Sequence, residues 1–143
     1  MIRRAVGAII YKDEQFLIVH KVKISSDKIP GEWDFIKGGI ENFDKSPQHA
    51  LLRELKEETG STDFLIREEF EEKICFRFPE KIKEKIGYER QETTMFLVEF
   101  RGDIENLSPL DEEIAELRFM PKNQVLSKLT HDDTRTFFIR NLS

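Results

Sequence analysis

Residues 38–61, which decide the fold, read GGIENFDKSPQHALLRELKEETGS. Ser46 suits the N-cap of a helix, Pro47 suits the first helical position, and Gly60 suits the C-terminal end after Thr59. Apolar residues recur between these signals at the spacing of one buried helix face, at Ala50, Leu51, Leu52 and Leu55. The stretch therefore predicts a helix over residues 47–59 that is preceded by a turn at Gly38 and Gly39.

Three carboxylates lie on the other side of this predicted helix. Glu54, Glu57 and Glu58 are spaced i, i+3 and i+4, so their side chains are neighbours, and each like-charge pair costs roughly 0.2–0.5 kcal/mol. Binding of a divalent cation would explain the clustering, since carboxylate oxygens suit Mg²⁺ or Mn²⁺. The alternative is an ordinary solvated helix face that is helped by an Arg53–Glu57 pair.

The spacing of these residues resembles the Nudix box of the MutT-like Nudix hydrolase family. That box has a glycine, five residues, a glutamate, seven residues and then R-E-U-x-E-E-x-G-U, where U is aliphatic. Here Gly39 is followed by five residues, Lys45, seven residues and the run RELKEETG over 53–60. The lead-in WDFIKGGIE over 33–41 also looks like the family's approach to the box. The resemblance implies an α+β fold, a Nudix-type α/β/α sandwich with a mixed β-sheet.

The resemblance also implies an activity, hydrolysis of a nucleoside diphosphate linked to another moiety. Glu57 and Glu58 would be the principal metal ligands, and the Gly39 region would add a backbone carbonyl. Glu54 would orient or deprotonate the attacking water or share a metal, and Arg53 would be structural. Clustered metals suit this chemistry because phosphoanhydride cleavage needs charge neutralisation, an activated water and in-line geometry.

A further glutamate often comes from a loop before a late strand in this family. Glu113 is the candidate here, with Glu112 and Glu116 as competitors.

Three positions depart from the family pattern. Lys45 stands in place of the first glutamate of the box, Ser61 replaces its closing aliphatic residue, and Ile36 replaces a proline common before the glycines. In the family, the first glutamate mainly supports the loop by pairing with the box arginine. Lys45 would instead repel Arg53. Asp44 or Glu41 could substitute as the partner.

Two residues outside the box bear on the substrate. The region around Phe78 looks like the dinucleoside polyphosphate hydrolases and bacterial RNA 5′-pyrophosphohydrolases, which often carry an aromatic residue at this distance after the box. Phe78 could stack on a base, although alternation with Phe76 equally suggests that both rings are core. Lys37 resembles a lysine that meets phosphate in diadenosine-polyphosphate members, or it is a solvated loop lysine.

The rest of the chain predicts one domain over residues 1–143 with strands mixed with helices. Apolar and β-branched runs predict strands over 2–11, 16–19, 70–78, 93–100 and 115–120, with a short apolar segment over 33–36. Loops are predicted over 23–32 and 79–90, and helical segments over 121–129 and 132–142. No internal repeat or low-complexity linker divides the chain.

Composition narrows the function classes. The chain has 143 residues, of which 36% are charged, and its formal net charge is −5, so binding along a DNA groove is not expected. One cysteine excludes an internal disulfide and a Cys-rich zinc site, and no apolar run reaches the ~18 residues of a membrane span. We expect a cytoplasmic monomer or homodimer acting on a nucleotide-type substrate, which includes an RNA 5′ end. The alternative is a non-catalytic nucleotide-binding or regulatory module on the same fold.

Overall fold

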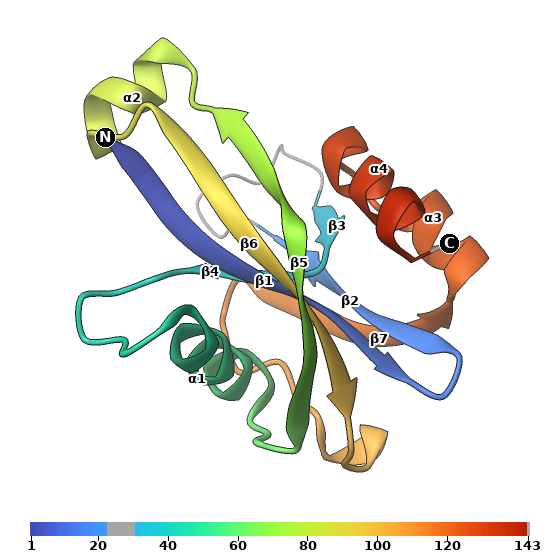
Figure 1. Cartoon of the computed structure of the whole chain (residues 1–143). Coiled ribbons are helices and arrows are strands. Elements are labelled where there is room, and N and C mark those ends of the chain that lie inside the picture. Colours follow the sequence, from blue (N-terminus) through green and yellow to red (C-terminus); the bar gives the residue numbers. More distant parts are fainter. Residues whose placement is uncertain (23–30, 143) are drawn as a thin grey trace.

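A computed structural model describes residues 1–22 and 31–142 of the chain (Figure 1). Most of the loop predicted over 23–32 therefore lies outside the described residues. The strands are β1 (Ile2–Lys12), β2 (Gln15–Lys21), β3 (Glu32–Asp34), β4 (Ile36–Gly39), β5 (Phe64–Arg77), β6 (Arg90–Phe100) and β7 (Ile114–Pro121). The helices are α1 (Pro47–Thr59), α2 (Glu80–Ile86), α3 (Lys122–Lys128) and α4 (Asp132–Asn141), and a short 3₁₀ turn spans Ile104–Asn106.

The strands form one mixed sheet in the order β3-β2-β1-β6-β5, with β4 also pairing with β1 and β7 with β2. The β1–β6 pair is parallel and spans most of both strands, from Ile2 opposite Arg90 to Tyr11 opposite Glu99. The other pairs are antiparallel. Strand β4, which leads into the helix of the box, is thus fixed against the centre of the sheet.

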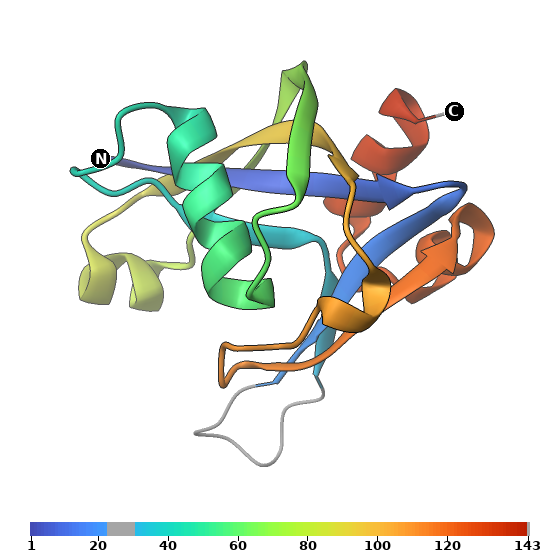
Figure 2. The ribbon, with the colours of Figure 1, turned by 90° about the horizontal axis from the view of Figure 1, so that it is seen from below.

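Helices cover both faces of this sheet (Figures 1 and 2). Helix α1 lies on one face, where Leu51 and Leu55 pack with alternate residues of β1 such as Val6 and Ile10. Helices α3 and α4 lie on the other face and pack on residues of the opposite parity, such as Ile9 and Ile18. The α+β sandwich with a mixed sheet is therefore confirmed. None of the described helices is long and apolar enough to span a membrane.

Helix α1 begins and ends where its capping residues predict. The Ser46 hydroxyl accepts a hydrogen bond from His49 N at 3.1 Å, and Gly60 takes a left-handed conformation with φ 77°. The Gly60 amide donates to the Lys56 carbonyl at 2.9 Å. Both ends of the helix are thus satisfied locally.

Four local predictions were wrong. Leu52, which was predicted within the buried face of α1, is 42% exposed. Residues 80–86 form α2 rather than a loop, because the segment EKIKEKI consists of good helix formers and Ile, and Gly87 caps it with φ 76°. Gly38 and Gly39 lie within β4 rather than in a turn. Strand β5 begins at Phe64 rather than near residue 70, since its first half is charged and largely exposed and lacks a strand-like apolar pattern.

Candidate active site

Strand β4 passes directly beneath helix α1 at Gly38. A Cβ atom at Gly38 would lie 2.2 Å from the Glu54 Cδ atom, so only glycine lets this carboxylate rest on the strand. Glu54 is half-buried there, and burial is the largest cause that raises its pKa. The sheet and the helix therefore hold the Glu54 carboxylate between them.

The Arg53 guanidinium ties the loop before α1 to the helix. It donates from Nε to Asp44 Oδ1 at 2.9 Å and from Nη2 to Asp44 Oδ2 at 2.8 Å, and Nη2 also donates to the Gly39 carbonyl at 3.1 Å. On its other side, Nη1 lies 3.1 Å from Glu54 Oε1 and 3.3 Å from Glu57 Oε2. This geometry fits the structural role predicted for Arg53.

Asp44 supplies the carboxylate that the Lys45 substitution removes. Its side chain is fully buried against the guanidinium, whose hydrogen bonds lower the pKa of Asp44 to about 2. The other predicted substitute, Glu41, contributes its backbone amide to Asp44 Oδ2 at 2.7 Å. Lys45 is exposed, and its amide donates to His49 Nδ1 at 3.1 Å. The loop is therefore supported one residue before the position that the box pattern uses.

Glu58 is the buried carboxylate of the three. It is 6% exposed, and among the described residues its Oε2 atom has no hydrogen-bond partner. Burial raises the pKa of Glu58 to about 8, while the nearby Lys21 ammonium lowers it and the Glu54 and Asp111 carboxylates raise it. A buried carboxylate oxygen without a donor costs free energy unless a proton or a cation meets it.

The carboxylate and carbonyl oxygens of this site are of the type that binds a hard divalent cation, and Arg53 contacts two of the three carboxylates. The described residues contain no group of three acidic, His or Cys side chains close enough to hold a metal ion. The carboxylates that Arg53 contacts are Glu54 and Glu57. The unpartnered Glu58 oxygen and the Gly39 carbonyl are ligands of the oxygen type that Mg²⁺ prefers. A cation bound here would replace Arg53 at Glu57, which is the most exposed of the three carboxylates.

The late loop brings a different carboxylate to the site than sequence reasoning selected. Asp111 is near enough to raise the pKa of Glu58, whereas Glu113 is exposed and holds the loop through its backbone, its carbonyl accepting from Val22 N at 2.7 Å. Glu116 pairs with Arg118. The amide of Glu113 also donates to Asp111 Oδ1 at 2.9 Å. Asp111, Glu112 and Glu113 form one acidic run before the predicted strand, so the sequence alone does not distinguish Asp111 from its neighbours.

Lys37 extends from β4 toward α4, and its ammonium is already engaged. Its Nζ atom is 3.2 Å from Asp34 Oδ1 and donates to Thr134 Oγ1 on α4 at 3.0 Å. The Asp34 carboxylate, buried at the end of β3, is also 3.9 Å from Lys21 Nζ. Asp34 therefore holds two lysines at this edge of the sheet, and phosphate contact by Lys37 stays a prediction.

The aromatic pair after the box is not a core pair. Phe76 is 41% exposed and Phe78 is half-buried, and their rings contact edge to face with centroids 5.0 Å apart. The interpretation of Phe76 as core was therefore wrong. The alternation of apolar residues continues to the end of β5, where the Phe76 ring is exposed. Base stacking by Phe78 stays a prediction.

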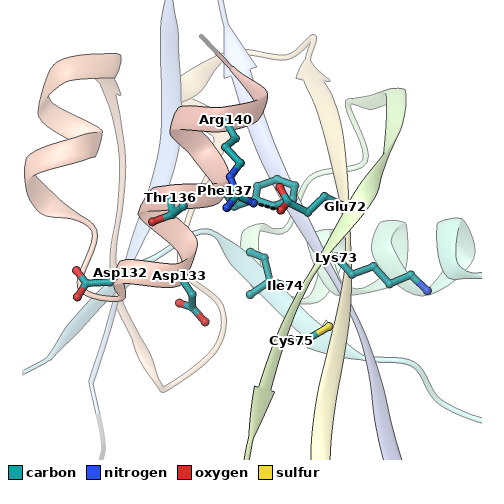
Figure 3. A pocket seen from close by; sticks show the side chains of 9 residues that line it. All are labelled: Glu72, Lys73, Ile74, Cys75, Asp132, Asp133, Thr136, Phe137 and Arg140. Carbon is teal, nitrogen blue, oxygen red and sulfur yellow. Dashed lines mark hydrogen bonds and ion pairs between the residues drawn. The ribbon is translucent and has the colours of Figure 1, made fainter.

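A cavity of about 380 Å³ lies between β5 and α4 (Figure 3). Ile74 and Phe137 form its apolar wall, Asp132 and Asp133 border it from α4, and Arg140 pairs with Glu72 across its opposite end. The lining of this cavity carries charges of both signs, since Lys73 and Arg140 also border it and Asp132 is paired with Arg135. Sequence reasoning did not find it, because it depends on how α4 lies against the sheet.

The fold and the box geometry place the chain in one family. A family model of the NUDIX domain matches residues 1–140, and the chain belongs to the Nudix family. Members of this family generally use divalent metal ions.

Curated relatives and solved structures agree with this assignment. The chain is 36% identical over 104 residues to an RNA pyrophosphohydrolase of Nitratiruptor sp.. The matched stretch covers 71% of this chain and 66% of that protein. The chain is 34% identical over 101 residues to the RNA pyrophosphohydrolase of Campylobacter jejuni, covering 69% of this chain and 64% of the relative. The matched stretches thus span slightly under two thirds of these relatives.

Solved structures share the fold at low identity. The chain resembles the E. coli dihydroneopterin triphosphate pyrophosphohydrolase with a TM-score of 0.74 at 13% identity, over 96% of this chain and 93% of that one. It resembles a C. elegans Ap4A hydrolase with a TM-score of 0.72 at 14% identity, over the same shares of the two chains. It also resembles the NUDIX domain of Shewanella oneidensis NrtR in complex with ADP ribose, with a TM-score of 0.67 at 17% identity, over 100% of this chain and 90% of that one.

Proposed function

We propose that the protein is a metal-dependent pyrophosphohydrolase that cleaves a phosphoanhydride bond of a nucleoside diphosphate linked to another moiety. The observation that carries this proposal is Glu58, a buried carboxylate with an unpartnered oxygen that adjoins Glu54 and Asp111. A structural helix face would be solvated or paired, whereas a metal-binding carboxylate needs an oxygen free of other donors. The relatives named RNA pyrophosphohydrolase favour a 5′-triphosphate RNA end as substrate. Dinucleoside polyphosphates and nucleoside triphosphates are the other candidates.

The residues divide the work between them. A bound Mg²⁺ or Mn²⁺ ion would neutralise charge on the phosphates and lower the pKa of a coordinated water. Glu57, Glu58 and the Gly39 carbonyl would hold the metal, and Glu54 would accept a proton from the attacking water. Its raised pKa and its fixed place over Gly38 suit a general base. Lys37 would leave Asp34 and Thr134 to meet a substrate phosphate. The late loop would add a further acidic residue, which is Glu113 by the sequence pattern and Asp111 by its nearness to Glu58.

Arg53 would hold the loop before α1 and the box carboxylates in place without contacting the substrate. Through Asp44 and the Gly39 carbonyl it fixes the loop that carries the backbone ligand. Its contacts with Glu54 and Glu57 offset the repulsion between the carboxylates when no cation is bound.

The second candidate is a nucleotide-binding or regulatory module on the same fold. One observation favours it, since Arg53 already neutralises two of the three carboxylates of the box. A binding module would bind a nucleotide without releasing phosphate from it. A cytoplasmic location and a monomeric or homodimeric state remain predictions.

A substrate panel separates the two candidates. The purified chain is incubated with Mg²⁺ and, in parallel, with nucleoside triphosphates, dinucleoside polyphosphates, sugar nucleotides and 5′-triphosphate RNA, and released phosphate and pyrophosphate are measured. We expect metal-dependent release, fastest with 5′-triphosphate RNA. Nucleotide binding without release from any member of the panel would support the binding module instead.

A further inference from the structure

A basic segment with exposed apolar side chains occupies one end of the sheet. Residues 73–90 contain six Lys or Arg against three Glu, whereas the whole chain has 23 against 28. The segment runs from the end of β5 through α2 to the start of β6, and α2 lies beside the N-terminus beyond these strand ends (Figure 1). Phe76 on β5 and Ile82 and Ile86 on α2 are each exposed by 41–43%. We call these residues together the β5–α2 surface.

The cations of the β5–α2 surface have no acidic partners in the described parts of the chain. The ion pairs found there involve neither Arg77, nor Arg90, nor the three lysines of α2. Arg77 and Arg90 even lie directly opposite each other in the β5–β6 register, which costs free energy between like charges. A surface of this kind is complementary to a polyanion.

A continuous row of side chains leads from this surface to Gly39 of β4. The row lies on the face of the sheet that α3 and α4 cover, because Arg3 has the same parity on β1 as Ile9. Phe76 lies opposite Gln91 in the β5–β6 pair, and Gln91 lies opposite Arg3 in the β1–β6 pair. The Arg3 guanidinium donates to the Gln91 amide oxygen and packs under Gly39, where a Cβ would lie 2.6 Å from Arg3 Nη2. The row crosses three strand intervals, or about 14 Å, from β4 to β5.

We propose that the β5–α2 surface binds the single-stranded RNA that follows the reactive 5′ end. Phe76 stacks on a base, because its ring is exposed at the edge of the sheet and Phe78 holds it edge to face. The lysines of α2 meet the phosphates. This inference rests on the proposed RNA substrate.

Three variants test the two contacts. Phe76→Ala removes the stacking ring, and Phe76→Leu keeps the packing against Phe78 without an aromatic face. The triple change Lys81→Gln, Lys83→Gln and Lys85→Gln removes the charges and keeps good helix formers. Leu65→Ala, at the other end of β5 and 36% exposed, is the matched control for the ring. Glu80→Gln with Glu84→Gln is the control for α2, because it changes the same helix with the opposite electrostatic sign.

Binding is measured by fluorescence anisotropy with a 5′-hydroxyl single-stranded RNA over a salt series, which needs no hydrolysis. Both Phe76 variants should weaken binding roughly 5- to 150-fold. The triple lysine variant should flatten the plot of log K against log salt by up to about 2, at roughly 0.7 per phosphate contact. Leu65→Ala should leave binding unchanged, and the double glutamate variant should strengthen it.

Turnover separates this inference from the proposed function. The variants should raise KM for a 5′-triphosphate oligonucleotide and leave the matching nucleoside triphosphate unaffected. Hydrolysis with an unchanged KM and unchanged RNA binding in all variants would overturn the inference and leave the proposed function standing. Absent hydrolysis would overturn the proposed function, and the anisotropy series would still decide the inference. If the same variants instead abolish self-association or binding to anionic vesicles while RNA binding is unchanged, the surface serves another partner and the inference is wrong.

Discussion

Asp44 accepts two hydrogen bonds from a single guanidinium, Arg53, at 2.9 and 2.8 Å. In the Nudix box, the first glutamate normally pairs with the arginine, and Lys45 occupies the position of that glutamate here. The Asp44–Arg53 pair replaces this ion pair. The carboxylate comes from the residue just before, and it is fully buried. The departure at Lys45 therefore does not leave Arg53 without a partner.

Asp44→Ala should lower both the melting temperature and the activity. Removing the carboxylate leaves the partly buried Arg53 guanidinium without its main partner and frees the Gly39–Asp44 loop. Residues that orient metal ligands typically change activity or metal affinity about 10–100-fold. Thermal unfolding and kcat/KM are measured on the same preparation. Unchanged activity would mean that the loop needs no support from Asp44.

Lys45→Glu should change little, since Asp44 already fills the role of the missing glutamate. Exposed substitutions of this kind usually change the free energy of unfolding by no more than about 0.5 kcal/mol. Activity should rise slightly or stay level. A sharp loss of activity with an intact fold would show instead that the lysine itself meets the substrate.

The metal-free protein should lose stability as the pH rises from about 5 to about 8. Burial raises the pKa of Glu58 to about 8 in the folded state, so the folded protein keeps a proton that the unfolded chain releases near its ordinary pKa. The slope from this one group is at most about 1.4 kcal/mol per pH unit. Chemical denaturation in a chelating buffer is compared between the wild type and Glu58→Gln. The variant should lack this slope, and equal slopes in both proteins would contradict the buried, unpartnered state of Glu58.

Gly38→Ala should reduce turnover without unfolding the protein. The added Cβ would lie 2.2 Å from the Glu54 Cδ atom, and the end of a flexible side chain moves more readily than the strand. The effect should disappear in a Glu54→Gln background, because the glutamate through which it acts is gone. A double-mutant cycle of kcat measures this coupling. If the kcat losses of Gly38→Ala and Glu54→Gln add in the double variant, Gly38 does not act through Glu54.

The sequence predicted the box helix well because its signals are local. Ser46, Pro47 and Gly60 suit their own helix ends, and helical spacing predicted the burial of Ala50, Leu51 and Leu55. Leu52 was predicted in the same stripe and is exposed. The sandwich architecture followed from the resemblance, and the mixed sheet rests on the long parallel β1–β6 pairing. Charge misled the prediction for residues 79–90, where helix-forming Lys and Glu were interpreted as a loop instead of α2.

Tertiary contacts decided what the sequence left open. Asp44 and Glu41 were equal candidates to support Arg53, and only the folded loop distinguishes them. Asp111 was missed because the neighbouring Glu112 and Glu113 also carry carboxylates. The folded turn determines that Asp111 is the carboxylate near Glu58. The engagement of Lys37 depends on Thr134, which is 97 residues away in the chain.

Turnover of 5′-triphosphate RNA by the wild type, Glu57→Gln and Glu58→Gln, at saturating substrate and Mg²⁺, tests the central claim most directly. A neutral amide is a poor Mg²⁺ ligand, so each variant should lose turnover by orders of magnitude while its circular dichroism spectrum matches the wild type. Both variants should also be as stable as the wild type or slightly more so without metal, because a crowded carboxylate is removed. Wild-type turnover in both variants would contradict the account of the box glutamates as the metal-dependent catalytic centre.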